Sequence, residues 1–189
     1  FFVVAAYAKI IPKNILDLAK LGTMGVHPSL LPKYRGATPI QSVILSGEKE
    51  TGVTLYLMDE KMDHGDILAT RVWPIANRAT HETLMHELAI ISADLLIKTI
   101  PNFINKKIIP VMQDHTQATF TKKFETIDGL VDSAKDNQII IDRKVRALNP
   151  DPGVYAFIER DGKKLRMKIL ETLIENGQLK LIKVQLEGR

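Results

Sequence analysis

Apolar and polar residues follow one another along the chain in blocks that predict strands and helices in turn. The run Phe1–Ala6 is apolar at every position, which is typical of a strand buried on both faces. Thr51–Met58 and Ile67–Ile75 are rich in β-branched residues and predict two more strands, joined by the polar turn Asp59–Asp66. A long amphipathic helix is predicted over Thr80–Ile100, because its apolar residues recur at helical spacing: Leu84, Leu88, Ile91 and Leu95.

Shorter elements lie between these blocks. Pro12 is suited to the first position of a helix that Gly22 would end. A strand over Met24–Val26 and a helix over Ala37–Ser46 follow. Strands that alternate with helices in this way predict an α/β layer with a mainly parallel sheet.

The pattern changes in the C-terminal third of the chain. Residues 113–136 are polar and lack periodicity, which predicts a linker, and Gln138–Arg146 predicts a short helix. After it come three short strands separated by the dipeptides Asp161-Gly162 and Asn176-Gly177, which are strong hairpin signals. We therefore expect a first domain over residues 1–112, a linker over 113–136 and a small antiparallel β domain over 137–189.

The two ends of the chain resemble interior sequence. The chain opens on an apolar strand with no Met and no polar leader, so we expect further sequence before Phe1. The last residues, Val184–Arg189, also resemble a truncated segment rather than a natural C-terminus.

Composition narrows the class of protein. The chain has 189 residues, of which 45% are apolar and 25% charged, as in ordinary globular proteins. No apolar run approaches the roughly 20 residues that a membrane-spanning helix needs, so no membrane partner is expected. The absence of cysteine excludes disulfides and thiolate chemistry.

The net charge of +4 is concentrated near one end. Residues 135–189 carry 12 Lys and Arg against 8 Asp and Glu, which accounts for the whole excess. This distribution predicts either an anionic partner there, such as nucleic acid, or simply a solvated basic surface.

One pair of residues could support proton transfer. His27 and Asp63 each follow a predicted strand, and the carboxyl ends of parallel strands would bring them to one edge of the sheet. Imidazole and carboxylate together suit proton transfer near neutral pH. No metal site is predicted, because the Asp59–Asp66 turn lacks calcium-loop spacing and His81 and His86 are five residues apart on a helix.

Several segments, in order, resemble the folate-dependent formyltransferases. Gly25–Gly36 resembles the family's signature loop, and Met58–Leu68 resembles its second signature, which carries an essential Asp. Four other segments resemble those of the branch that formylates methionine on initiator tRNA: Tyr7–Pro12, Gly36–Gln41, Gln117–Lys123 and Arg146–Tyr155. The resemblance implies a partial Rossmann-like domain with a mainly parallel sheet, followed by a small, shortened, OB-like antiparallel β-barrel. It also implies that the first strands of the catalytic domain, with a loop that contacts tRNA, precede Phe1.

The resemblance assigns roles to particular residues. His27 and Asp63 match the catalytic His and Asp, which stabilise the oxyanion and relay protons. The segment Ser29, Leu30, Leu31 and Pro32 matches the loop that binds the donor, 10-formyltetrahydrofolate. The implied acceptor is initiator methionyl-tRNA, whose phosphates would meet basic residues of the C-terminal domain: Lys163, Lys164, Arg166 and Lys168. A monomer working in the bacterial cytoplasm or in an organelle is implied, with no metal.

One position departs from the family pattern. Gly25 stands where the family has an Asn, whose amide would donate to the oxyanion. The Gln41 amide, a backbone N–H or water could substitute, or catalysis could be weak. We expect that Gly25→Asn leaves the fold intact and raises turnover.

Three functions stay open on the sequence. The first is formylation of methionine on initiator tRNA. The second is formylation of a sugar nucleotide or another small amine; the segment Arg146–Tyr155 argues against the purine-pathway enzymes, which have a single domain. The third is a folate- or RNA-binding protein with little catalysis, which the glycine at position 25 motivates.

Overall fold

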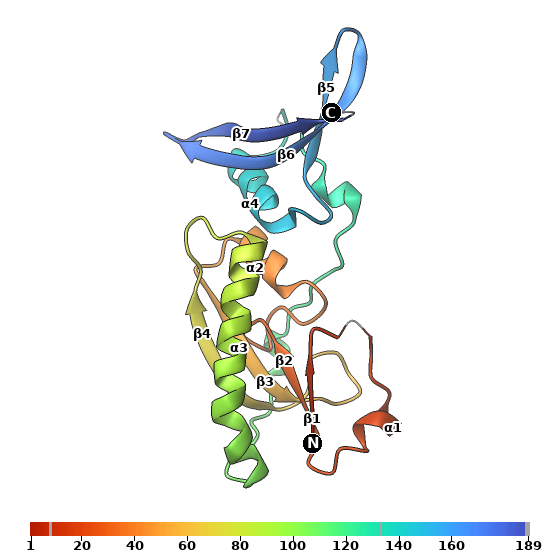
Figure 1. Cartoon of the computed structure of the whole chain (residues 1–189), viewed down its shortest axis with the longest axis vertical. Coiled ribbons are helices and arrows are strands. Elements are labelled where there is room, and N and C mark those ends of the chain that lie inside the picture. Colours follow the sequence, from red (N-terminus) through yellow and green to blue (C-terminus); the bar gives the residue numbers. More distant parts are fainter. Residues whose placement is uncertain (8, 133, 188–189) are drawn as a thin grey trace.

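The computed structural model describes residues 1–7, 9–132 and 134–187, and shows two sheets stacked along an elongated molecule (Figure 1). Ala8 of the Tyr7–Pro12 segment and the last two residues, Gly188 and Arg189, lie outside the described residues. The helices are α1 (Lys13–Leu16), α2 (Pro39–Ser46), α3 (His81–Ile104) and α4 (Gln138–Leu148). The strands are β1 (Phe2–Ala5), β2 (Thr23–His27), β3 (Glu50–Leu57), β4 (Ile67–Pro74), β5 (Tyr155–Arg160), β6 (Lys163–Glu175) and β7 (Gln178–Leu186).

The first sheet has the strand order β1-β2-β3-β4 and mixed pairing. Only β1 and β2 are parallel among the described strands, whereas β2–β3 and β3–β4 are antiparallel. The expected α/β class is confirmed. The prediction that the sheet is mainly parallel is wrong. A parallel pair needs a crossover of a dozen or more residues, and the turn between β3 and β4 is too short for one.

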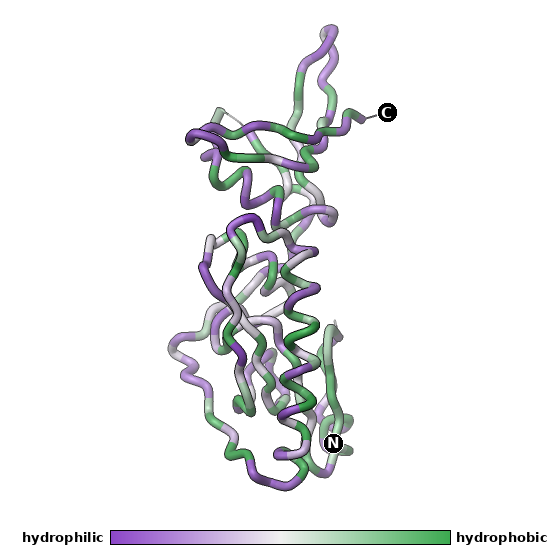
Figure 2. The backbone as a smooth tube through the Cα atoms, turned by 60° about the vertical axis from the view of Figure 1, so that its left-hand side comes forward, coloured by the Kyte–Doolittle hydropathy of each residue, from purple (hydrophilic) through white to green (hydrophobic). Residues whose placement is uncertain are grey.

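α3 covers this sheet, and its apolar residues pack with those of α2 in the core of the first domain. Leu84 and Leu88 of α3 are buried to 0% and 1% exposure against β3, as the apolar stripe predicted. Figure 2 shows the alternation of hydrophobic and polar residues along this helix. Thr80 caps α3 by accepting a hydrogen bond from the Thr83 N–H, and the helix continues past the expected end to Ile104. The first helix is shorter than expected and ends at Leu16.

The C-terminal module consists of α4 and an antiparallel sheet of order β5-β6-β7. The small antiparallel module is therefore confirmed; its described strands form an open three-stranded sheet rather than a closed barrel. The β5–β6 hairpin projects away from the body of the molecule, and α4 lies between the two sheets, where it contacts α2 and β6 (Figure 1). The boundaries at residues 112 and 136 stay predictions.

A buried ion cluster joins the two modules. Asp142 of α4, only 3% exposed, accepts hydrogen bonds from Arg78 at 2.7 Å, from Arg146 at 2.9 Å and from the Thr172 hydroxyl at 2.9 Å. Arg78 precedes α3, and Thr172 lies in β6, so this one carboxylate links the first domain to the second sheet. Within the described ranges, no helix is both long and apolar enough to cross a membrane.

Candidate active site

His27 lies at the end of β2 and is almost fully buried, with 5% of its surface exposed. Its Nε2 lies 2.8 Å from the Tyr34 carbonyl oxygen. A carbonyl oxygen only accepts, so this contact assigns the ring proton to Nε2 and leaves Nδ1 free to accept a proton. Burial lowers the pKa of His27, and the nearby Arg35 charge lowers it further. Asp63 and the Tyr34 carbonyl act to raise this pKa, but burial outweighs them. The imidazole is therefore neutral at pH 7.

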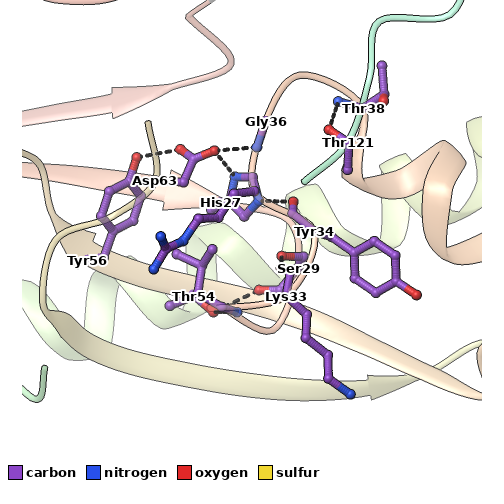
Figure 3. Close-up of polar contacts among 12 residues, drawn as sticks. His27, Ser29, Lys33, Tyr34, Gly36, Thr38, Thr54, Tyr56, Asp63 and Thr121 are labelled. Atoms are coloured by element: carbon purple, nitrogen blue, oxygen red, sulfur yellow. Dashed lines mark hydrogen bonds and ion pairs between the residues drawn. The ribbon is translucent and has the colours of Figure 1, made fainter. Parts of the chain in front are cut away.

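Asp63 lies in the turn between β3 and β4 and faces this imidazole (Figure 3). Its Oδ1 accepts a hydrogen bond from the Tyr56 hydroxyl at 2.7 Å, and its Oδ2 accepts one from the Gly36 N–H at 2.7 Å. The same Oδ2 lies 3.6 Å from His27 Nδ1, too far for a hydrogen bond but close enough for a strong charge interaction. The carboxylate is thus aimed at the imidazole nitrogen that can take up a proton.

The structure brings His27 and Asp63 together, but not by the route expected from parallel strands. Antiparallel pairing sets Met24 opposite Leu57, so the end of β3 lies beside the start of β2. The turn after β3 folds back along the sheet and carries Asp63 to the other end of β2. Asp63 has a φ of 50°, in the left-handed region that tight turns require.

We expect the His27 imidazole to be more than half neutral at about pH 6.5, with its proton on Nε2. The reason is that burial penalises the charged form in the folded protein alone. The unfolded chain therefore binds this proton first as the pH falls, and the free energy of unfolding declines as the pH drops below the ordinary histidine value of 6.5. Imidazole ¹⁵N chemical shifts across a pH titration measure both the tautomer and the pKa. A predominantly charged ring at that pH would contradict the assignment.

A glutamine that the sequence analysis missed braces the Asp63 turn. The Gln113 side-chain N–H groups donate to the carbonyls of Asp63 at 3.0 Å and Gly65 at 2.7 Å, and Arg35 donates to its amide oxygen at 2.5 Å. Gln113 is 2% exposed although it lies in the predicted linker. A polar residue in an unpatterned segment carries no local signal of such a role, so only its tertiary contacts reveal it.

The four residues of the expected folate loop divide into two roles. Ser29 donates its hydroxyl to the Lys33 carbonyl at 2.7 Å, and the Ser29 carbonyl accepts from the Thr54 hydroxyl at 2.7 Å, so Ser29 holds the loop in shape (Figure 3). Leu31 is buried and its N–H is bonded to Thr54. Leu30 and Pro32 are half-buried and are the two members left to present apolar surface to a ligand.

Two hollows lie beside this loop in the described structure, and neither is lined by His27 or Asp63. A cavity of about 70 Å³ includes Leu30, Lys33 and Tyr34 in its wall. A wider groove of about 500 Å³ runs between α2 and residues 119–124, with Leu45, Phe120 and Phe124 among its lining residues. Solvent reaches the His27–Asp63 pair instead at Asp63, whose side chain is 15% exposed.

A side chain at position 25 would meet Tyr56, and the expectation that Gly25→Asn leaves the fold intact and raises turnover stays a prediction. A Cβ atom there would lie 2.4 Å from Cε1 of Tyr56, closer than non-bonded carbons approach. An asparagine must therefore displace the Tyr56 ring, which the sequence alone did not reveal. Gln41, which the sequence offered as a substitute donor, makes no side-chain hydrogen bond to His27 or Asp63 in the described ranges.

The basic residues of the C-terminal module are divided between the two faces of the β5–β6 hairpin. Lys164, Arg166 and Lys168 alternate along β6 and so share one face, whereas Lys163 points to the other. On the shared face, the Lys164 ammonium lies 4.4 Å from the Phe157 ring centre, and the Arg166 guanidinium lies 3.7 Å from that of Tyr155. This hairpin therefore presents a strip of cations together with the exposed Phe157 ring, whereas the Tyr155 ring that Arg166 covers is buried.

A histidine pair flanks the Asp63 turn without forming a metal centre. The rings of His64 and His115 stack at 4.1 Å, and His64 Nδ1 lies 2.6 Å from an Asp59 carboxylate oxygen. Across residues 1–7, 9–132 and 134–187, no three His, Asp or Glu residues are grouped so as to hold a metal ion.

Comparison with known proteins matches both parts of the chain to one family. Residues 1–100 match "Formyl transferase" and residues 123–188 match "Formyl transferase, C-terminal domain". The chain is 44% identical to a methionyl-tRNA formyltransferase of Chloroflexus aurantiacus over 82% of its own length and 50% of that protein's. It is 36% identical to one of Lactobacillus johnsonii, over 100% of its own length and 66% of that protein's.

The fold also has a counterpart among solved structures. HypX from Aquifex aeolicus, crystallised in complex with tetrahydrofolic acid, superposes with a TM-score of 0.75 at 24% identity. The match covers 92% of this chain and 29% of HypX. Against several curated relatives, including that of Chloroflexus aurantiacus, the chain spans about half of their length.

Proposed function

The chain belongs to the formyl transferase family, and on that premise we propose that it transfers a formyl group from 10-formyltetrahydrofolate to the amino group of methionine on charged initiator tRNA. The observation that carries the proposal is the convergence of a buried neutral imidazole and a braced carboxylate, His27 and Asp63, 3.6 Å apart. Such a reaction belongs to translation initiation, in the bacterial cytoplasm or in an organelle.

The pair is suited to move the proton that formyl transfer must move. The attacking amine forms a bond to the formyl carbon, and the bond from that carbon to the donor nitrogen breaks. The amine proton passes to His27 Nδ1, and the imidazolium then returns it to the leaving nitrogen. Asp63 stabilises the positive charge on the ring while the proton is there, because its Oδ2 faces Nδ1.

Three features support folate as the donor. The prolines at positions 28 and 32 stiffen the loop, and Ser29 and Leu31 pin it to Thr54, so its surface is ordered before a ligand arrives. Leu30 and Pro32 would pack against the flat pterin ring. The fold counterpart HypX has been crystallised with tetrahydrofolic acid.

The acceptor is supported by the C-terminal module. The relatives that align with the chain, one of them across its whole length, are named methionyl-tRNA formyltransferase. The strip of cations and the exposed Phe157 ring would meet tRNA phosphates and bases without reading sequence.

Removing the cations of that strip is expected to weaken tRNA binding and flatten its salt dependence. The triple variant Lys164→Gln, Arg166→Gln, Lys168→Gln loses three phosphate contacts, so the slope of log K against log salt should become less steep by about 2 to 3. The measurement is tRNA affinity between about 50 and 200 mM salt. Lys163→Gln is the matched control, because Lys163 lies on the other face of the hairpin. An unchanged slope in the triple variant would remove this hairpin from the interface.

The function itself is tested with 10-formyltetrahydrofolate and charged initiator tRNA, with an amino-sugar nucleotide as competing acceptor. The assay uses this chain and a fusion that adds the part of the Chloroflexus aurantiacus relative that the chain does not cover, because the chain aligns with half of that relative. Formyl-methionyl-tRNA in either preparation supports the proposal. Formylation of the sugar alone, or folate binding with no transfer in both preparations, would overturn it.

A further inference from the structure

Gly25 lies in the middle of β2, where its backbone has no need of glycine. It is buried and paired in the sheet directly opposite Tyr56 of β3, and its φ lies outside the left-handed region. The reason for glycine is therefore steric. A Cβ at position 25 would lie 2.4 Å from Cε1, 2.5 Å from Cζ and 2.9 Å from the hydroxyl oxygen of Tyr56. The phenol end of Tyr56 occupies the side-chain space of residue 25.

The same ring reaches Asp63. The Tyr56 hydroxyl donates to Asp63 Oδ1 at 2.7 Å, while Oδ2 remains bonded to the Gly36 N–H and faces His27 Nδ1 (Figure 3). Tyr56 is 4% exposed. Burial, together with the nearby Asp63 charge, raises the pKa of Tyr56 far above its ordinary value, so the phenol keeps its proton and remains a donor.

We propose that Tyr56 is a positioning residue of this site, matched to the glycine at position 25: its ring fills the space that residue leaves, and its hydroxyl holds the Asp63 carboxylate towards His27. This inference rests on the proposed function for its catalytic meaning. Its geometric part, the link from residue 25 through Tyr56 and Asp63 to His27, concerns the free protein and can be measured without any substrate.

The first test separates the hydroxyl from the ring. Tyr56→Phe keeps the ring beside Gly25 and removes the donor to Asp63, so the carboxylate charge acts more fully on His27. We expect the His27 pKa to rise by about 0.5 to 1, read from imidazole ¹⁵N shifts of the unliganded protein. In an active preparation, the acid limb of the kcat profile should move by the same amount, with KM little changed.

The matched control is Tyr34→Phe. It removes another phenol that donates to a carboxylate, Glu48 at 2.6 Å, and leaves the Tyr34 carbonyl on His27 in place. This variant should leave the His27 pKa unchanged. If Tyr56→Phe also leaves it unchanged, Tyr56 only fills space and the proposal is overturned.

The second test addresses the pairing of residues 25 and 56. Gly25→Ala should lower the melting temperature by several degrees, because its Cβ pushes against the ring. Adding Tyr56→Leu should recover part of that loss, since the shorter side chain vacates the space. Losses that simply add in the double variant would overturn the pairing. If Gly25→Ala does not fold, folding of the double variant by itself demonstrates the pairing, and failure of both overturns it.

These measurements keep the two proposals apart. A rise in the His27 pKa in Tyr56→Phe, in a protein that transfers no formyl group, would overturn the proposed function and leave the Tyr56 link standing. If Tyr56→Phe leaves the His27 pKa unchanged in a protein that does transfer formyl groups, the Tyr56 link is overturned and the proposed function stands.

Discussion

Replacing Asp63 with asparagine is expected to lower kcat/KM for formyl transfer by about 10²–10⁴, the range that a positioned acid–base group contributes. The amide keeps the shape of the side chain but loses the charge that stabilises the His27 imidazolium across 3.6 Å. The asparagine amide can accept hydrogen bonds only through its oxygen, whereas both carboxylate oxygens of Asp63 accept one. Either the Tyr56 hydroxyl or the Gly36 N–H therefore loses its acceptor. The measurement is steady-state formylation of charged initiator tRNA.

Glu60→Gln is the matched control for this substitution. Glu60 lies in the same turn and its side chain is 64% exposed, with Lys13 at 3.7 Å as its ion-pair partner. Neutralising it changes the charge of the turn by the same amount without touching the His27–Asp63 pair, so kcat/KM should stay within about twofold of the parent value. Equal losses in both variants would show that the turn acts through its overall charge and that Asp63 has no special place.

Replacing Asp142 with asparagine is expected to lower the free energy of unfolding by about 1–3 kcal/mol, because Arg146 is mostly buried while Arg78 is 42% exposed and can be solvated. The substitution leaves two guanidinium groups, those of Arg78 and Arg146, without their counterion at a site where Asp142 is 3% exposed. Because Asp142 links α4 to both the first domain and β6, the loss should also loosen the contact between the modules. Urea unfolding measures the first effect, and limited proteolysis within residues 113–136 measures the second.

The pH dependence of stability gives an independent check on Asp142. Burial opposes its ionisation, but the hydrogen bonds from Arg78, Arg146 and Thr172 outweigh that effect and hold its pKa below the ordinary value of 3.8. The stabilisation is therefore complete above that value and is lost as the pH falls through the lower pKa of the folded state. The acid limb of the unfolding free energy should be shallower in the asparagine variant than in the parent protein.

Glu175→Gln is the control for the ion cluster. Glu175 pairs with Lys180 at the tip of the β6–β7 hairpin, where both side chains are about half exposed. Exposed pairs of this kind contribute about 0–1 kcal/mol. A loss in Glu175→Gln as large as that in Asp142→Asn would mean that burial of the Asp142 cluster has no special effect on stability.

Local patterns in the sequence were sufficient for the elements and for the candidate pair. The helical spacing of Leu84 and Leu88 placed α3, and the Asp-Gly and Asn-Gly dipeptides placed the C-terminal hairpins. His27 and Asp63 were identified because each lies in a segment whose residue order is itself a signature. These features depend on neighbours a few residues away, which is the range over which backbone geometry acts.

The tertiary structure decided which distant residues meet. The sequence alone determined an α/β domain, a small antiparallel β module and a His–Asp pair, but it predicted a mainly parallel sheet. Whether β2 and β3 pair in parallel or antiparallel is settled by how the whole sheet buries its faces, and so is the register that sets Gly25 opposite Tyr56. The same long-range packing brings Gln113 to the Asp63 turn and Asp142 to Arg78. Such contacts join residues far apart along the chain, so no local pattern encodes them.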